Sequence, residues 1–96
     1  MSDEYLATWY RAEHFNTNSV VAEINVVVAG IILTAEGGNS GARIYEGVNG
    51  SGTLRFRLLA IDGTTVPLTF EPSVLFDRGM YIELDDANAN VTVLFV

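Results

Sequence analysis

Residues 20–35, with the sequence VVAEINVVVAGIILTA, decide the fold class. Apolar side chains recur there at every second position, at Val20, Ala22, Ile24, Val26 and Val28. A period of two puts apolar side chains on one face of a β-strand and polar ones on the other. Gly30 interrupts the run, which predicts a bulge or a bend before a more fully buried strand at 31–35.

The same pattern of short strands and turns fills the rest of the chain. Further extended segments are predicted at 42–46, 54–60, 66–70, 73–76, 80–84 and 91–95. Turns rich in Gly, Asn and Asp separate them, at 36–41, 48–52, 62–63, 77–79 and 85–90. Turns at this spacing are typical of a β-sandwich or a small barrel, and no helical period of apolar residues follows Ser19.

Single residues add detail to this prediction. Pro67 predicts an edge strand or a strand start, because proline cannot donate to a strand ladder, and Pro72 predicts a break in the ladder. In the segment 54–60, Leu54 is expected to face the core with the apolar residues that follow. Arg55 and Arg57 are expected to share the opposite face.

The first 18 residues differ from the remainder in composition. They hold four of the chain's aromatic residues, and we expect an arm, extended or with a short helix capped at Ser2, before a sandwich domain of residues 19–96. Aromatic residues are enriched at interface hot spots, which favours a partner-binding segment; the alternative is a lid over the domain's own core. The candidate partner-binding residues are Tyr5, Leu6, Trp9, Tyr10 and Phe15.

Composition excludes several classes of protein. The chain of 96 residues has no Cys and no Lys, so it offers no disulfide, thiolate metal site, cysteine nucleophile or P-loop lysine. Its net charge of −7 argues against binding to nucleic acid, because phosphate contacts need a cationic face. The longest apolar run, residues 26–33, is too short for a membrane helix, and the acidic amino terminus does not resemble a secretory signal. We expect synthesis in the cytoplasm and no membrane partner.

No residue pattern points to catalysis, a cofactor or a bound metal. His14 is the only histidine, and no nucleophile elbow accompanies it, so we expect a surface or interface residue. Residues 86–90 resemble the start of a calcium loop but lack its later Gly and Glu, which favours a polar turn. A weak cation site at Glu83, Asp85 and Asp86 stays open. Among the acidic residues, only Glu23 and Glu46 are expected to escape full solvation.

The stretch 28–96 resembles a set of small phage virion proteins. The resemblance rests on strand and turn motifs, namely residues 29–35 (AGIILTA), 37–41 (GGNSG), 42–47 (ARIYEG), 51–54 (SGTL), 67–70 (PLTF), 76–79 (FDRG), 80–84 (MYIEL) and 91–96 (VTVLFV). Such proteins are head decoration, or cement, proteins or, less often, fibre or tail-associated β-domains. The resemblance implies a single small β-sandwich, jelly-roll-like, of seven to eight antiparallel strands.

The resemblance also implies a role and partners. A decoration protein is not an enzyme; it lies on the capsid exterior and binds the major capsid protein and itself, as a homodimer or homotrimer. Two alternatives remain. One is a fibre or tail domain that binds carbohydrate through Tyr45, Tyr81, Asn49 and Arg43, although both tyrosines also suit ordinary cross-strand pairing. The other is a subunit of a different assembly, such as a head–tail connector.

Overall fold

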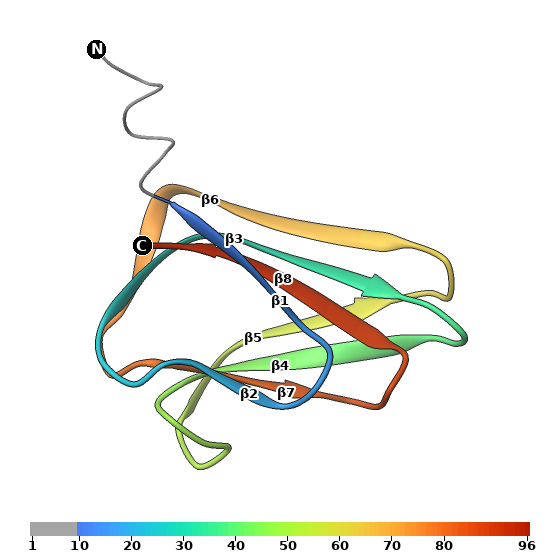
Figure 1. Ribbon diagram of the computed structural model, residues 1–96, viewed down its shortest axis with the longest axis horizontal. Helices are drawn as coiled ribbons and strands as arrows, with labels where there is room; N and C mark the ends of the chain where they lie inside the picture. Colours follow the sequence, from blue (N-terminus) through green and yellow to red (C-terminus); the bar gives the residue numbers. More distant parts are fainter. Residues whose placement is uncertain (1–9) are drawn as a thin grey trace.

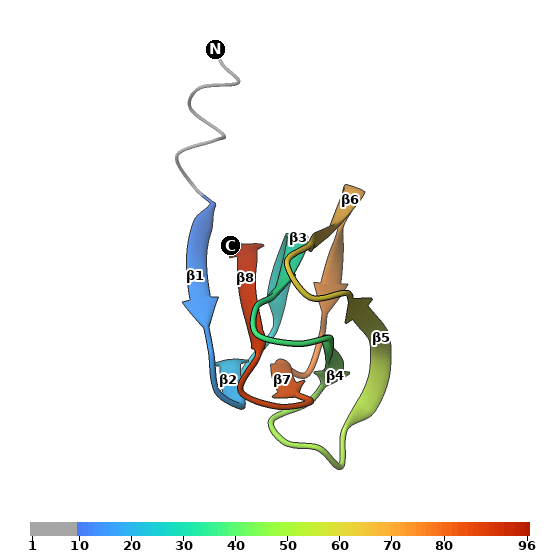
Figure 2. The same ribbon diagram turned by 90° about the vertical axis from the view of Figure 1, so that its right-hand side faces the viewer.

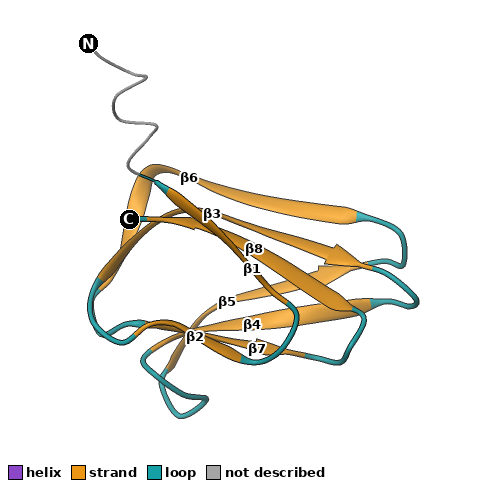
Figure 3. Cartoon of the chain, viewed as in Figure 1, coloured by secondary structure: helices purple, strands orange, loops and turns teal. Residues whose placement is uncertain are grey.

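The computed structural model describes residues 10–96, which form β-strands and turns without a helix (Figures 1 and 3). The strands are β1 (Arg11–Phe15), β2 (Ser19–Ala22), β3 (Val26–Ala35), β4 (Ser40–Glu46), β5 (Thr53–Ala60), β6 (Thr65–Phe76), β7 (Met80–Leu84) and β8 (Ala89–Phe95). This confirms the predicted all-β class. No helix capable of crossing a membrane occurs in residues 10–96.

The strands form two four-stranded antiparallel sheets that pack face to face (Figure 2). Sheet A has the order β1-β8-β3-β6, and sheet B has the order β2-β7-β4-β5. Each strand in the first half of the chain therefore pairs with its counterpart in the second half: β1 with β8, β2 with β7, β3 with β6 and β4 with β5. This nested pairing is that of one long hairpin folded over into two sheets, which is the jelly-roll topology. The predicted β-sandwich is therefore confirmed.

The core lies between the two sheets, where each strand contributes alternate residues. In β7 and β8 the alternation is complete, because every second residue is buried and those between are only partly so. The largest fully buried side chains are Phe76, Ile31, Leu33, Ile44, Met80 and Ile82. Burial of each such side chain contributes about 1.5–3 kcal/mol to folding, so the inward row of each strand fixes which face it turns to the core.

The apolar row predicted from Val20 to Val28 lies on two strands and not on one. Residues 23–25 form a bend between β2 in sheet B and β3 in sheet A, and Ile24 is 74% exposed at this crossing. The sequence-based assignment of Ile24 to the core is therefore wrong. The jelly roll requires the chain to change sheets here, and a continuous strand cannot do so.

The predicted bulge near Gly30 is confirmed. The register of β3 with both neighbours shifts between Val28 and Gly30, and Ala29 is the extra residue relative to β8; β3 stays in sheet A. Opposite this bulge, residues 70–73 of β6 have no pairing partner on β3. This confirms the predicted break in the ladder near Pro72. Pro67 lies on β6, the edge strand of sheet A, as its missing N–H predicts.

The amino-terminal boundary of the sandwich differs from the expected one at residue 19. Residues 11–15 form β1, which pairs with β8 along its full length (Figure 1). Phe15 pairs with the buried Val91 and packs against the core, so we remove it from the partner-binding candidates. Tyr5, Leu6 and Trp9 lie outside the described residues.

Two isoleucine truncations test the crossing between the sheets at residues 23–25. One is inside the core and the other is at the crossing. Ile44 is fully buried, so Ile44→Ala is expected to lower the free energy of unfolding by about 2–5 kcal/mol through lost burial and a cavity. Ile24→Ala, at an exposed position, is expected to change it by less than about 0.5 kcal/mol. Urea denaturation measures both values, and similar losses for the two variants would contradict the crossing at 23–25.

Candidate functional site

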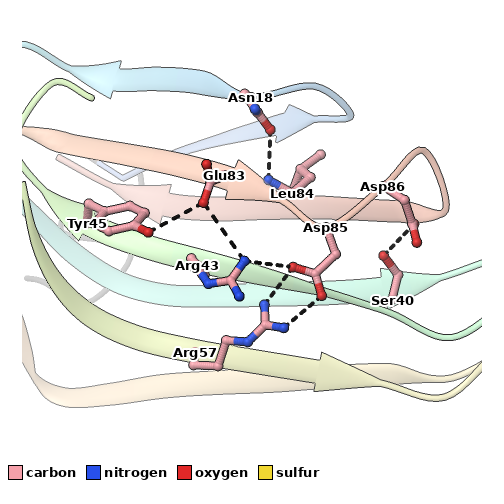
Figure 4. A network of polar contacts seen from close by, with 9 residues as sticks. All are labelled: Asn18, Ser40, Arg43, Tyr45, Arg57, Glu83, Leu84, Asp85 and Asp86. Carbon is pink, nitrogen blue, oxygen red and sulfur yellow. Dashed lines mark hydrogen bonds and ion pairs between the residues drawn. The ribbon is translucent and has the colours of Figure 1, made fainter. Parts of the chain in front are cut away.

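The outward surface of sheet B carries the densest polar network in the described chain (Figure 4). Cross-strand partners share a face of a sheet, and the register places Tyr45 beside Tyr81 and Arg43 between Glu83 and Arg57. We call this surface, with Asp85 at the end of β7, the sheet B face. Its members are Arg43, Tyr45, Arg57, Tyr81, Glu83 and Asp85.

Asp85 is the centre of the network. Arg57 donates from both terminal nitrogens to the two Asp85 carboxylate oxygens, at 2.7 and 2.8 Å, and Arg43 donates to Oδ1 at 3.4 Å. To reach Arg57 on β5, the Asp85 side chain passes over Gly41 on β4. A Cβ atom at Gly41 would lie 2.8 Å from Asp85 Oδ2 and 2.6 Å from the Leu58 carbonyl oxygen. Only glycine leaves room for this arrangement.

The pairing fixes the charge of both partners. Hydrogen bonds from Arg57 lower the pKa of Asp85 below its ordinary value, against the opposing effect of partial burial. The same hydrogen bonds raise the pKa of the Arg57 guanidinium. A carboxylate that is held ionised by a bidentate arginine is poorly suited to exchange a proton near neutral pH. The network therefore suits recognition or rigidity better than acid–base chemistry.

The two tyrosines lie next to this network. Their ring centroids are 6.2 Å apart with the planes inclined by 44°, and the Tyr45 hydroxyl donates to Glu83 Oε1 at 3.4 Å. Both rings are half-buried, which agrees with cross-strand pairing and still leaves part of each ring exposed. The structure thus brings together three of the four residues proposed for carbohydrate, Tyr45, Tyr81 and Arg43.

Asn49, the fourth of these residues, has a local role. Its side-chain oxygen accepts a hydrogen bond from the Ser51 backbone N–H at 2.8 Å, which closes the turn between β4 and β5. This is the usual role of asparagine in a tight turn. We therefore leave Asn49 out of the candidate site.

A surface hollow of about 320 Å³ adjoins the sheet B face beyond Asp85. Its polar wall is formed by Asp85 and by the turn before β4, and its apolar wall by Leu59 and Ile61, which are 64% and 69% exposed. The lining residues are Asn39, Ser40, Leu59, Ala60, Ile61 and Asp85. This hollow could not be predicted from the sequence, because its lining comes from three separate segments.

A second ion pair lies at the opposite end of sheet B, where it contacts the end of β6 in sheet A. Arg55 donates to Glu46 Oε1 at 2.6 Å, and the guanidinium lies 4.9 Å from the ring centre of the buried Phe76. The other Glu46 oxygen accepts from the backbone N–H groups of Asp77 and Arg78, at 2.8 and 3.2 Å. Burial alone would raise the pKa of Glu46, but these hydrogen bonds outweigh it and lower the pKa. Glu46 is therefore a structural clamp on the turn between β6 and β7.

This clamp exists because β5 contains a bulge. Ile44 pairs with Phe56 while Tyr45 pairs with Leu54, so Arg55 is the extra residue. The bulge separates Arg55 from Arg57, which contradicts the prediction that they share one face, and it turns Leu54 outward, where it is 50% exposed. Strict alternation cannot reveal an extra residue in one strand.

The other residues singled out in the sequence are dispersed. Asp85 faces two arginines, whereas Asp86 accepts from the Ser40 hydroxyl at 2.7 Å and Glu83 lies beside Tyr45. Within residues 10–96, no three His, Asp or Glu side chains are grouped to hold a metal ion. His14 is exposed on the outer face of sheet A, with Nδ1 3.3 Å from the Thr92 hydroxyl.

After the sheet B face and the Glu46 clamp, the third feature of interest is the end of the sandwich at which β1 begins. Tyr10 is 38% exposed there, and its hydroxyl lies 3.1 Å from the Ser73 hydroxyl on β6. A hollow of about 330 Å³, lined in part by Arg11, Asn25 and Val96, opens beside it. We call the exposed apolar side chains at this end the apolar end; they are Tyr10, Ile24, Leu75 and Val96. Sequence reasoning found only Tyr10 among them.

No protein-family model matches the chain, and no curated protein matches it significantly.

The pH dependence of stability tests the Asp85 network. Because its pKa is lowered in the folded state, ionised Asp85 stabilises the fold above the ordinary carboxyl pKa of about 3.9, and this contribution is lost as the pH falls through the lower, folded-state value. Asp85→Asn is therefore expected to cost about 1 kcal/mol of unfolding free energy at pH 7, a modest value for a partly exposed pair. The difference from the unsubstituted protein should shrink below about pH 4.

Urea denaturation between pH 3 and pH 7 measures this difference. Asp77→Asn, at an exposed turn position, is the matched control and should remain close to the unsubstituted protein throughout. A cost for Asp85→Asn that stays constant down to pH 3 would show that the carboxylate charge contributes nothing.

Proposed function

We propose that this chain is a non-enzymatic virion structural protein, a decoration protein that binds a phage head from the outside and stabilises it. The observation that carries the proposal is the apolar end, where the aromatic-rich segment 1–9 joins the sandwich. Large apolar side chains gathered on a surface mark sites of protein interaction. The partner we propose is the major capsid protein.

The backbone that carries Val96 and Leu75 at the apolar end is paired within sheet A. Val96 exchanges two backbone hydrogen bonds with Val27, at 2.8 and 3.3 Å, and Leu75 pairs with Val27 from the other side. Tyr10 is tied to Ser73. Pre-ordered anchors lose little conformational entropy on binding, so more of the contact energy contributes to affinity. Tyr5, Leu6 and Trp9, by their position in the sequence, would extend this anchor.

The charge of the chain supports a place on the particle exterior. A net charge of −7 disfavours contact with packaged DNA. A protein that binds only the assembled shell stabilises it by mass action, with no bond made or broken. Many copies on one lattice add small contributions into a large one.

Removal of residues 1–9 is the direct test. The shorter deletion is preferable to removing residues 1–18, because residues 11–15 form β1 and the Asn18 side chain accepts from the Leu84 N–H at 2.8 Å. We expect the truncated protein to keep its melting temperature within a few degrees and to lose binding to heads that lack this protein. Occupancy is measured by co-sedimentation.

Two outcomes of that measurement would count against the proposal. Normal occupancy by the truncated protein would refute the role of residues 1–9, and Ile24→Asp would then show whether the apolar end binds without them. Failure of the full chain to bind heads, with the fold intact, would refute the proposed function.

A second candidate function is carbohydrate recognition by the sheet B face. The observation in its favour is that Tyr45, Tyr81 and Arg43 lie side by side, with Glu83 within reach of both Tyr45 and Arg43. Sugar sites combine an aromatic ring that stacks on the pyranose with polar groups that orient it. Jelly rolls serve lectins as well as capsids, so the fold permits both functions.

Glycan-array binding distinguishes the two candidates. If the sheet B face binds carbohydrate, the full chain binds a defined set of glycans, and Tyr45→Ala or Tyr81→Ala reduces the signal at least tenfold. Tyr10→Ala, which removes a tyrosine from the apolar end, is the control and should bind like the unsubstituted protein. An array without specific binding would refute this second candidate.

A further inference from the structure

The outer face of sheet A differs in composition from the sheet B face. Cross-strand pairing places its outward residues in three rows across β1, β8, β3 and β6. The rows are Asn90–Thr34–Thr65, His14–Thr92–Ile32–Pro67 and Ala12–Leu94–Gly30–Thr69. We call these residues the uncharged face, and we infer that two copies of this chain associate through it.

None of these positions is an Asp, Glu or Arg, although the chain has seventeen such residues. Arg11 and Glu13 on β1 point to the other side of the sheet, since they pair with the inward residues Phe95 and Val93. Glu71 lies in the unpaired part of β6, at the border of the face. Depletion of charge is the compositional signal of the centre of a protein interface.

The charge of the chain restricts the surface through which a second copy can bind. Two copies, each with a net charge of −7, repel each other wherever their acidic surfaces meet. Contact through the uncharged face brings no like charges directly opposite each other. Threonine hydroxyls on this face can both donate and accept hydrogen bonds, so the same surface is complementary to itself, as a two-fold interface requires.

Burial of this face costs little, because several of its polar groups already have partners. The Thr34 and Thr65 hydroxyls are 3.0 Å apart, and His14 Nδ1 is 3.3 Å from the Thr92 hydroxyl. Unpaired polar groups are the expensive ones to remove from water. Gly30 adds no side chain to the middle of the face, which leaves Leu94 and Thr69 to cover it.

The paired rows of the face alone cover slightly less area than a specific interface needs. Four strands at about 4.8 Å spacing span about 19 Å, and the paired length of β3 and β8, about seven residues at 3.4 Å each, spans about 24 Å. Contact over that flat area buries about 450 Å² per copy and about 900 Å² in total, without the additional area of projecting side chains. This total is near the lower limit of about 1,000 Å² for a specific interface. The neighbouring Val27 and Leu75, on the same outer side, extend it.

The sheet B face does not suit this role. Its charged side chains, Arg43, Arg57, Glu83 and Asp85, would have to be desolvated together. The inference for the uncharged face does not depend on the proposed function, since it concerns contact between copies of this chain alone.

Sedimentation velocity on the full chain between about 5 and 500 µM tests the inference. We expect a dimer that dissociates on dilution, because a two-fold contact through one face closes with two copies. Thr92→Arg places a charge in the central row and is expected to raise the dissociation constant at least tenfold. Thr53→Arg makes the same substitution at an exposed threonine of β5 in sheet B, and this control should associate like the unsubstituted chain.

Circular dichroism and the melting temperature show whether the variants remain folded. If Thr92→Arg does not fold, Thr69→Arg on the edge strand β6 replaces it, since an edge position accommodates a long side chain more readily. A full chain that is monomeric at 500 µM, or an oligomer unaffected by a folded variant of the uncharged face, would overturn the inference. Head binding is measured separately, so loss of one property without the other distinguishes this inference from the proposed function.

Discussion

The pairing of β3 with β8 on one side and β6 on the other is the constraint on which the rest of the structure depends. These three strands bring both halves of the chain into sheet A, and the inward residues of β3 meet those of sheet B in the core. Once β3 is placed, the chain on either side must cross to the opposite sheet. The crossings at 23–25 and 36–39 are therefore consequences of the core and not independent features.

Local departures from strand regularity position the polar side chains. The bulge at Arg55 turns one arginine toward Glu46 at the end of the sandwich and leaves Arg57 on the sheet B face. Gly41 opens the path by which Asp85 reaches Arg57 across an intervening strand. The ion pairs of Asp85 join the end of β7 to β4 and β5, which are distant from it in sequence, so they reinforce the roll. The Arg55–Glu46 pair joins the consecutive strands β4 and β5 and reinforces that hairpin.

The described surface divides into regions of different physical character. The sheet B face is rich in charge but internally compensated, the paired rows on the outer face of sheet A contain no Asp, Glu or Arg, and the apolar end gathers exposed apolar side chains beside β1. The sheet B face and the apolar end share no residue, so a domain divided in this way can contact one partner through each of them. That property suits a component of an assembly, which is the proposed function.

The sequence by itself determined the all-β class, most of the strands and the inward rows of β4, β7 and β8, because a period of two in apolar residues directly reflects a half-buried strand. It also indicated the bulge near Gly30 and the edge position of Pro67, since these residues act through their own backbones. Only the tertiary structure decided that Ile24 is exposed, that Leu54 and Arg55 exchange faces, and that residues 11–15 belong to the sandwich. Each of these outcomes depends on which strand lies alongside, and that is set by the burial of residues far apart in the chain.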